Sequence, residues 1–146
     1  MRLQKNTLLA LHSVLEFAGQ PARHISAAEI AEKYGVSAHH LAKVLAELAR
    51  NGVVESVRGA GGGYRFTGNA RRLTLLDIIA LFEEFAPSAA ERAATDGMTP
   101  VDQALDAVLS EIDENARATF GSITLATMLR LIDRQQASAG GERNPA

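Results

Sequence analysis

Apolar side chains recur every three or four positions through the first fifty residues, a spacing that predicts three short helices. The first covers residues 3–18. The second starts at Ser26, whose Ser-Ala-Ala-Glu sequence has the form of a capping box, and stops at Gly35. Ser37 is the expected N-cap of the third helix, which continues to Arg50. The second and third helices are therefore predicted to form a tight helix-turn-helix pair.

The pattern then changes to β-branched and aromatic residues, which favour strands. Residues 53–57 and 64–67 are both rich in strand-forming side chains. Residues 58–63 join them, and four of these six residues are glycine. Because glycine adopts backbone angles that are closed to other residues, this connection predicts the tip of a two-stranded hairpin.

The second half of the chain is predicted to be helical. A capping box at Thr74 opens a stretch to Phe85 that is apolar on almost every side, so we expect it to be buried. Residues 87–97, rich in Ala and Ser, are predicted to be a linker. Thr99-Pro100 then supplies an N-cap and a proline at the first helical position. The helix that follows carries one apolar stripe, made of Val101, Ala104, Leu105, Val108, Leu109 and Ile112.

The predicted elements indicate a mainly α fold with a small β-hairpin wing. We expect a winged helix-turn-helix DNA-binding domain over residues 1–72 and a helical dimerisation or sensor region over residues 73–136. The last helix of that region is expected to start at residue 122 or 124. Residues 137–146, which contain Gly-Gly and Pro, are expected to be a disordered tail. Because no sheet covers the apolar stripes of the last two helices, they need a partner surface, and a homodimer supplies one.

Composition narrows the class of protein. The 146 residues suffice for one domain, and 47% apolar with 22% charged residues is typical of globular chains. No apolar run reaches the roughly 18 to 20 residues that span a bilayer, and the first residues lack a small-residue cleavage site, so we expect no secretory signal. The absence of cysteine excludes disulfides, Cys-ligated zinc and Cys-ligated iron–sulfur clusters. We therefore expect a cytoplasmic protein with no membrane partner.

Charge divides the chain into a basic and an acidic half. Residues 1–72 hold ten Lys or Arg and five Glu, a balance of +5, whereas residues 73–146 hold five Arg and twelve Asp or Glu, a balance of −7. Together these give the net charge of −2. Such asymmetry suggests a nucleic-acid-binding part joined to another unit. The alternative is chance clustering on solvated helix faces.

The third predicted helix has one face for the core and another for a groove of DNA. At 100° per residue, its large aliphatic side chains fall in one narrow arc: Leu41, Val44, Leu45 and Leu48. Nearly opposite lie the long donors His39, Lys43 and Arg50, beside the small Ala42 and Ala46. A recognition helix needs this combination of donors and close approach. An ordinary amphipathic surface helix is the alternative for this segment taken alone.

The predicted hairpin adds arginines to the same surface. Arg58 stands at the tip, where a guanidinium can enter the minor groove of DNA. Arg65, Arg71 and Arg72 are expected near the hairpin base, where they can neutralise phosphates. The glycines do not form a nucleotide-binding loop, because no Gly-Lys-Ser or Gly-Lys-Thr follows and a strand comes next.

Metal binding and catalysis find little support. His24 lies apart in sequence, and the neighbouring His39 and His40 point about 100° apart on a helix, so they cannot easily share one ion. DNA contact or plain surface is expected for His39, and packing or phosphate contact for His40. No nucleophile and base form a plausible pair, so we expect no enzyme, no metal site and no cofactor.

Several motifs resemble the Rrf2 family, the IscR/NsrR/CymR type of bacterial transcriptional regulator. They are MRL at residues 1–3, IAEKYGVS at residues 30–37, HLAKV at residues 40–44, VRGAGGGY at residues 57–64, LTLLDII at residues 73–79 and ITL at residues 123–125. The Arg-Gly-x-x-Gly-Gly wing after a helix-turn-helix is the most specific of them. The resemblance extends to about residue 131.

The resemblance implies a homodimer that joins through the helix at residues 100–118 and binds double-stranded DNA at a palindromic operator. Transferred position by position, the recognition-helix contacts would be Ser37, His39, His40 and Lys43, and the wing contact would be Arg58 with Gly59. Two departures stand out. Many members ligate an iron–sulfur cluster through three cysteines at the positions of residues 84–99, and this chain has none. The aromatic residue usual near position 9 is Leu9 here.

We therefore expect a sequence-specific DNA-binding repressor that does not sense through a Cys-ligated cluster. One alternative is a protein-interaction module of the same fold that acts on a partner protein through its acidic helices. Another is a regulator triggered by an unknown small molecule or protein effector that acts through residues 87–97.

Overall fold

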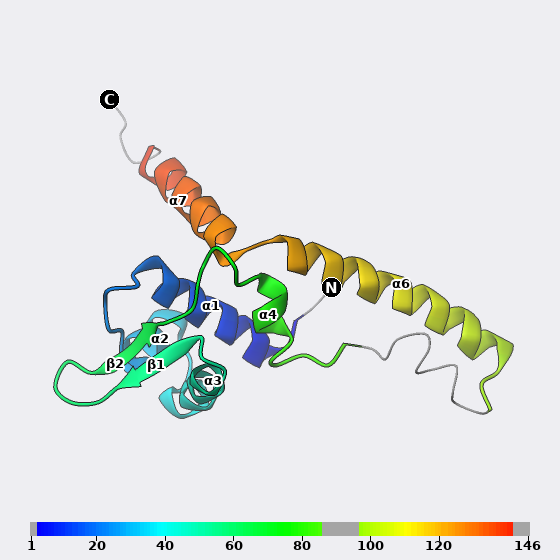
Figure 1. The fold of residues 1–146 in the computed structure, drawn as a ribbon, viewed down its shortest axis with the longest axis horizontal. Coiled ribbons are helices and arrows are strands. Elements are labelled where there is room, and N and C mark those ends of the chain that lie inside the picture. The colour runs from blue at the N-terminus through cyan, green and yellow to red at the C-terminus, as the bar shows by residue number, and fades with distance from the viewer. Residues whose placement is uncertain (1–2, 86–96, 142–146) are drawn as a thin grey trace.

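A computed structural model describes residues 3–85 and 97–141. Within them the order of elements is α1 (Lys5–Gly19), α2 (Ala27–Tyr34), α3 (Ala38–Arg50), β1 (Val54–Val57), β2 (Gly63–Phe66), α4 (Leu75–Ile79), α6 (Pro100–Ser122) and α7 (Leu125–Gly141). Figure 1 shows a body made of α1 to α4 with the hairpin, from which α6 and α7 project in different directions. The predicted fold class, mainly α with a β-hairpin wing, is confirmed.

Local capping sets the boundaries of the helix-turn-helix. The Ser26 hydroxyl accepts a hydrogen bond from the backbone N–H of Glu29, and α2 ends at Gly35 with φ of 63°, a left-handed angle that favours glycine. Ser37 caps α3 in the same way. A complete capping box would also have the Glu29 side chain accept the Ser26 backbone N–H. This part of the prediction is wrong, because the Glu29 carboxylate pairs with Arg23 at 2.9 Å instead.

The wing is an antiparallel hairpin with an additional contact to the helical body. β1 pairs with β2 in a register that places Glu55 opposite Arg65. Outside this pair, Ile25 forms an isolated bridge with Tyr64, through hydrogen bonds of 2.9 and 2.8 Å. The base of the wing is therefore fixed to the residue that precedes the cap of α2.

One apolar core holds the body together. It includes Leu9, Val14 and Phe17 of α1, Ile30 of α2, Leu41, Leu45 and Leu48 of α3, Val54 and Phe66 of the hairpin, Ile78 of α4, and Leu125 of α7. Most of these side chains are fully buried, and each element buries the apolar face that its sequence periodicity predicts. The start of α7 is thus part of the same core as the helix-turn-helix.

The corner between α6 and α7 is fastened to the body by backbone hydrogen bonds. Thr74 and Thr124 form an isolated bridge, flanked by bonds from Leu75 N–H to the Ile123 carbonyl at 2.9 Å and from Leu125 N–H to the Leu73 carbonyl at 2.8 Å. The predicted capping box at Thr74 is present and starts α4 beside this corner. Both projecting helices are therefore anchored at their shared corner.

Two expectations for the acidic half need correction. The stretch from Thr74 to Phe85 was expected to be buried almost throughout, but α4 ends at Ile79, and only Ile78 and Ile79 are buried. The chain turns after Ile79, whose carbonyl accepts hydrogen bonds from two of the next residues, and the Glu83 side chain then binds the start of α1.

The expected disordered tail is wrong for residues 137–141, because α7 continues to Gly141. Ala137, Ser138 and Ala139 contain no helix-breaking residue, and both glycines that follow are still helical. Residues 142–146 of that tail, and residues 87–96 of the predicted linker, lie outside the described residues. Across the described ranges, no helix is long and apolar enough to cross a membrane.

Candidate nucleic-acid interface

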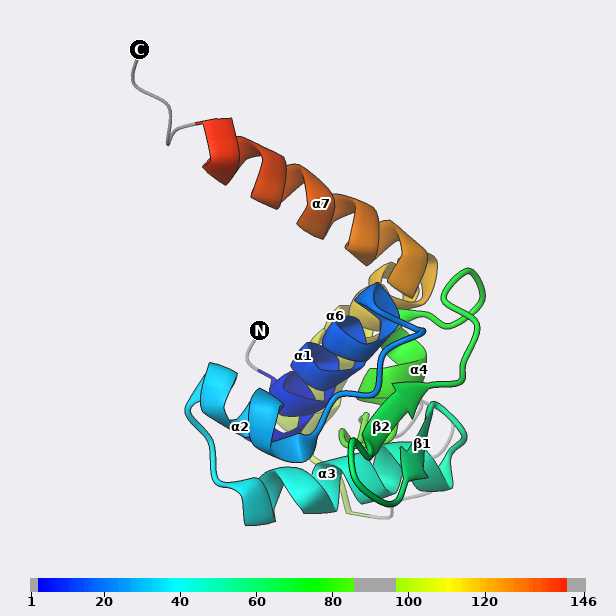
Figure 2. The same ribbon diagram turned by 90° about the vertical axis from the view of Figure 1, so that its left-hand side faces the viewer.

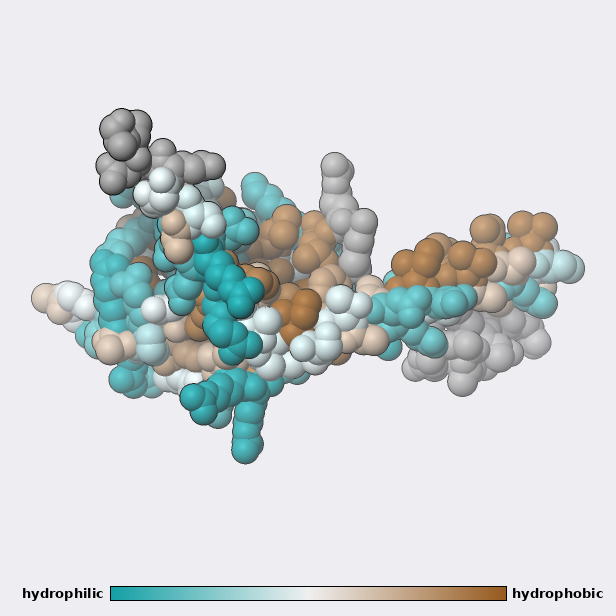
Figure 3. All heavy atoms as spheres, turned by 90° about the horizontal axis from the view of Figure 1, so that it is seen from above, coloured by the Kyte–Doolittle hydropathy of each residue, from teal (hydrophilic) through white to brown (hydrophobic). Residues whose placement is uncertain are grey.

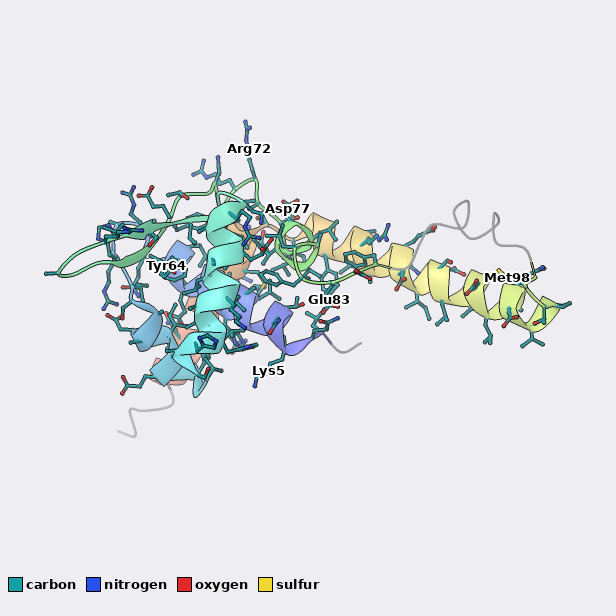
Figure 4. All side chains as sticks on the ribbon, turned by 90° about the horizontal axis from the view of Figure 1, so that it is seen from below. Lys5, Tyr64, Arg72, Asp77, Glu83 and Met98 are labelled. Carbon is teal, nitrogen blue, oxygen red and sulfur yellow. The ribbon has the colours of Figure 1, made fainter. Side chains whose placement is uncertain are left out.

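The two faces predicted for α3 are present. Leu41, Val44, Leu45 and Leu48 are at most 2% exposed and pack into the core, whereas His39, Lys43 and Arg50 are exposed. Ala42 and Ala46 are exposed on the same side. Viewed from below, α3 lies across the front of the body with no other helix or strand in front of it (Figure 4). The helix therefore offers a polar face, with small residues between its donors, to a large partner.

The start of α3 is organised by Ser37 and His40. The Ser37 hydroxyl accepts a hydrogen bond from the His40 backbone N–H at 3.0 Å, and the hydroxyl proton remains available to an outside acceptor. The His40 side chain is half-buried, and its Nε2 atom has no hydrogen-bond partner among the described residues. The Ser37 hydroxyl, together with the free N–H groups of the helix N-terminus, suits a phosphate oxygen. The Nε2 atom of His40 is itself buried, so it is closed to an outside phosphate.

Arg58 follows β1 directly and is exposed at the start of the wing loop. The loop depends on its glycines. Gly59 and Gly61 have φ of 108° and 76°, and a Cβ added to Gly62 would lie 2.4 Å from the Val57 carbonyl oxygen. Since only glycine tolerates both the angles and the close approach, the loop is narrow and carries little side-chain bulk beside Arg58.

The sequence predicts five arginines on this surface in addition to Lys43, and they differ in whether a carboxylate neutralises them. The five are Arg50, Arg58, Arg65, Arg71 and Arg72. Arg50 pairs with Glu47 at 2.6 Å, and Arg65 pairs with Glu55 across the hairpin. Arg58, Arg71 and Arg72 make no ion pair with any residue that the structure describes, and the same holds for Lys43. Among these, Lys43 on α3 and Arg58 on the wing loop carry the positive field of the α3 and wing face.

Arg71 and Arg72 lie beyond the wing and are both exposed. The Asn69 side chain accepts a hydrogen bond from the Arg71 backbone N–H at 3.0 Å, which fixes the turn that presents them. In Figure 4 Arg72 projects away from the body. This turn is fastened to the start of α7, because the Leu125 N–H bonds the Leu73 carbonyl and the Ala126 N–H bonds the Ala70 carbonyl, both at 2.8 Å. Figures 1 and 2 accordingly show it beside the corner of α6 and α7, away from α3 and the wing loop.

Sequence reasoning missed the carboxylates that neutralise two of the predicted arginines. Glu47 lies three positions before Arg50 on the same helix, a spacing at which ion pairs form, so this partner was readable. Glu55 meets Arg65 through the hairpin register, which the sequence left open. The contact of Ile25 with Tyr64 that anchors the wing has no local signal at all.

A family model described as an iron-dependent transcriptional regulator, Rrf2, matches residues 3–131 of this chain. The chain is 49% identical over 145 residues to BadM of Rhodopseudomonas palustris, a protein named as an HTH-type transcriptional regulator. That match covers 99% of this chain and 90% of BadM. It is also 29% identical over 132 residues to the HTH-type transcriptional regulator IscR of Xenorhabdus nematophila, covering 89% of this chain and 80% of IscR.

Solved structures give the same picture of the fold. The structure of T. potens IscR matches with a TM-score of 0.76 and 25% identity, and the match covers 93% of this chain and 91% of that one. CymR of B. subtilis, titled the global cysteine regulator, matches with a TM-score of 0.73 and 23% identity, covering 90% and 98% of the two chains. At that identity the CymR match supports the fold alone.

The family model is described as iron-dependent, but this chain lacks the cysteine ligands that would hold an iron–sulfur cluster. The sequence has no cysteine, so a cluster held by three thiolates is excluded. In residues 3–85 and 97–141, no three His, Asp or Glu side chains gather in a way that could hold a metal ion. The residues of this chain therefore do not fit a cysteine-ligated iron–sulfur cluster.

Proposed function

The chain belongs to the Rrf2 family of transcriptional regulators, and from this premise we propose that it is a homodimeric repressor that binds a palindromic DNA operator. As a member of that family it is a DNA-binding transcriptional regulator and not an enzyme. The observation that carries the proposal is the exposed face of α3. It presents Lys43 beside small alanines, next to a wing that carries Arg58, and neither cation pairs with a carboxylate in the described part of the chain.

The proposed DNA contacts follow from exposure and charge. Lys43 and His39 lie on the outer face of α3, where they reach base edges or phosphates in the major groove. Ser37, at the helix start, suits a phosphate, whereas the buried Nε2 atom of His40 favours packing for that side chain. The flexible guanidinium of Arg58 enters the adjacent minor groove, where Gly59 permits close approach of the backbone.

Arg50 and Arg65 have a weaker claim than Lys43 and Arg58. Each already pairs with a carboxylate of its own element or hairpin. A phosphate has to displace Glu47 or Glu55 before it gains the full charge of either arginine. We therefore assign Arg50 and Arg65 to secondary phosphate contacts at the edge of the interface.

The proposed dimer rests on the apolar stripe of α6. Val101, Leu105, Val108, Leu109 and Ile112 are between 54% and 68% exposed, and they form a continuous hydrophobic surface along the projecting helix (Figure 3). A row of five large apolar side chains in water is unusual for a monomer and typical of an interface. A second copy offers the same stripe, so a two-fold pairing covers both.

A two-fold dimer relates two copies of α3 and of the wing. DNA that matches such a dimer contains two inverted half-sites, spaced by whole turns of the double helix. The acidic α6 helices lie away from the basic face in this arrangement, which keeps their charge apart from the phosphates. Repression follows when the dimer occupies DNA that RNA polymerase needs.

The proposal is tested by capture of genomic fragments from the source organism on the purified protein, followed by sequencing. The Arg58→Ala variant runs alongside, with Arg130→Ala on α7 as a control of equal charge change. Enrichment of one palindromic motif, lost in Arg58→Ala and kept in Arg130→Ala, supports the proposal. Equal retention of unrelated fragments by all three proteins contradicts it and favours a protein-interaction module. A reporter gene behind the enriched motif then distinguishes repression from activation.

A further inference from the structure

A cavity lies between α7 on one side and α1 with the end of α2 on the other. Its volume is about 620 Å³, within the range of roughly 300–1,000 Å³ that small-molecule sites occupy. One wall comes from α1 and the end of α2, and the other comes from the middle of α7. Figure 2 shows α7 extending away from α1 and α2 after it leaves the corner with α6. A molecule bound here contacts both parts of the chain at once.

The lining combines an apolar base with a polar rim. Leu15 of α1 faces Met128, Leu129 and Ile132 of α7, and all four side chains are only half-buried. Their incomplete burial leaves apolar surface that an apolar ligand can cover. The polar rim consists of His12, Glu16, Gln20, Lys33, Tyr34, Asp133 and Gln136.

Within this rim, the Glu16 carboxylate is held in place by two hydrogen bonds. Its Oε1 atom accepts hydrogen bonds from Lys33 Nζ, at 2.6 Å, and from the Tyr34 hydroxyl. Its Oε2 atom has no hydrogen-bond donor among the described residues. Because both donors converge on one oxygen, the carboxylate is held in place with its second oxygen available.

Two pKa values support this description of the rim. Burial raises the pKa of Tyr34, and the neighbouring Glu16 carboxylate raises it further, so the tyrosine hydroxyl keeps its proton. Burial also tends to raise the pKa of Glu16, but the hydrogen bonds from Lys33 and Tyr34 outweigh it and the pKa is lower than usual. Glu16 is therefore a carboxylate at neutral pH.

The charge of the lining favours a cation. Lys33 balances Glu16, whereas Asp133 is exposed and makes no ion pair with any residue in the described ranges. Asp133 is therefore the carboxylate of the lining that has no cationic partner in the described ranges. An anionic ligand would have to compete with Glu16 for Lys33, while a cationic ligand meets Asp133 and the second oxygen of Glu16.

We propose that this cavity is an effector site for a small organic cation, an ammonium or amidinium group on an apolar body. The charged group lies between Glu16 Oε2 and Asp133, and the apolar body covers Leu15, Leu129 and Ile132. Its action as an effector rests on the proposed DNA-binding function, because the ligand alters DNA affinity by linking α2 to α7. Its binding does not depend on DNA.

The test uses n-hexylammonium as the probe, with hexanol and hexanoate as neutral and anionic matches. Each is titrated into the isotope-labelled full-length protein, and backbone amide shifts are followed by NMR. We expect saturable shifts in α1, α2 and α7 with hexylammonium, and at least about threefold weaker binding of hexanol and hexanoate, the size of one exposed charge pair. Equal binding of all three probes, or no saturable shift with hexylammonium, overturns the proposal.

Variants locate the site. Asp133→Asn is expected to weaken hexylammonium binding by about threefold, while Glu111→Gln, an equal change on α6, leaves it unchanged. Ile132→Trp fills the cavity and is expected to abolish binding with the dimer mass intact. If Ile132→Trp instead converts dimer to monomer in sedimentation, this face is an interface between copies and the proposal is wrong.

The two proposals fail separately. If genomic capture enriches a motif but hexylammonium neither binds nor changes the affinity for that motif, the effector site is wrong and the regulator stands. If hexylammonium binds as expected but no motif is enriched, the cavity is a ligand site and the operator-binding function is wrong.

Discussion

The carboxylate of Glu83 accepts a hydrogen bond from the Thr7 hydroxyl at 2.8 Å, across 76 positions of the chain. The same oxygen accepts the backbone N–H of Gln4 at 2.7 Å. Thr7 is fully buried, and Glu83 lies beside the start of α1 in Figure 4. One side chain from the segment after α4 therefore satisfies two donors at the N-terminal end of α1, where no side chain of the helix itself does so.

Thr7→Val tests this contact, because valine keeps the shape of threonine and removes the hydroxyl. We expect a loss of about 1–3 kcal/mol in the free energy of unfolding, since a charged acceptor loses a buried partner. Urea denaturation measures it. Glu84→Gln, at an exposed neighbouring position, serves as the control and should leave stability unchanged. Equal midpoints for Thr7→Val and the wild type would show that the contact contributes nothing.

The hydrogen bonds that Lys33 and Tyr34 donate to Glu16 should make the free energy of unfolding depend on pH. Although burial opposes it, hydrogen bonds from Lys33 and Tyr34 lower the pKa of Glu16 below its ordinary value of 4.5 in the folded protein. A carboxyl with a lowered folded pKa stabilises the protein above its unfolded pKa, and this stabilisation is lost as pH falls through the folded pKa. Glu16→Gln should therefore be less stable than wild type at pH 7, with a smaller difference below pH 4.5.

Urea unfolding at several pH values measures this difference. Tyr34→Phe, which removes one of the two donors, should destabilise the protein by about 1–2 kcal/mol at neutral pH. A constant difference between Glu16→Gln and wild type over the whole acid range would contradict the assignment.

Gly62 is predicted to be essential to the shape of the wing. In Gly62→Ala the new Cβ would lie 2.4 Å from the Val57 carbonyl oxygen and 2.8 Å from that of Gly59, so the hairpin tip must open. We expect about 1–3 kcal/mol of strain, faster amide exchange in β1 and β2, and weaker DNA binding. Gly140→Ala in α7, where a Cβ meets nothing within 4 Å, should change none of these.

Lys43 distinguishes phosphate contact from base recognition. If Lys43 contacts only phosphate, Lys43→Ala should weaken binding to all DNA sequences equally and reduce the slope of log affinity against log salt by about one unit per contact. If it contacts a base, the loss should concentrate at one position of the operator. Fluorescence anisotropy over a salt series, with Arg130→Ala as the control, separates the two. Unchanged affinity and slope would remove Lys43 from the interface.

The stripe on α6 predicts how the dimer is broken. Val108→Glu places a charge at the centre of the proposed interface and should raise the dimer Kd by roughly thirtyfold or more, equivalent to about 2 kcal/mol. Ala107→Glu adds the same charge on another face of the helix and should leave the dimer intact. Sedimentation equilibrium measures both, and equal masses for the two variants would place the interface elsewhere.

Features of local origin were predictable from the sequence. The caps at Ser26, Ser37, Thr74 and Thr99 were recognised because a cap depends on residues within one turn of each other. The two faces of α3 followed from its periodicity for the same reason. The stripe of α6 was predicted as apolar and unpartnered, and in the structure it is exposed.

Features that depend on the tertiary fold were not predictable. Whether Arg65 is free or paired is decided by the register that brings Glu55 opposite it. Glu83 reaches Thr7 only because the chain turns after α4, and the residues around that turn carry no sequence pattern that predicts it. The cavity beside Glu16 exists because only the beginning of α7 packs on α1. The spacing of apolar residues along α7 does not predict how much of the helix makes that contact.

The bridge between Thr74 and Thr124 fixes the rotational phase of α6 at its base. One residue inserted between this anchor and the stripe would turn Ile112 and Val108 by about 100° around the helix, whereas an insertion near a whole number of turns would return them to the same side. Natural variation in the length of α6 should therefore occur in steps of three, four or seven residues, while single insertions should be absent from working relatives.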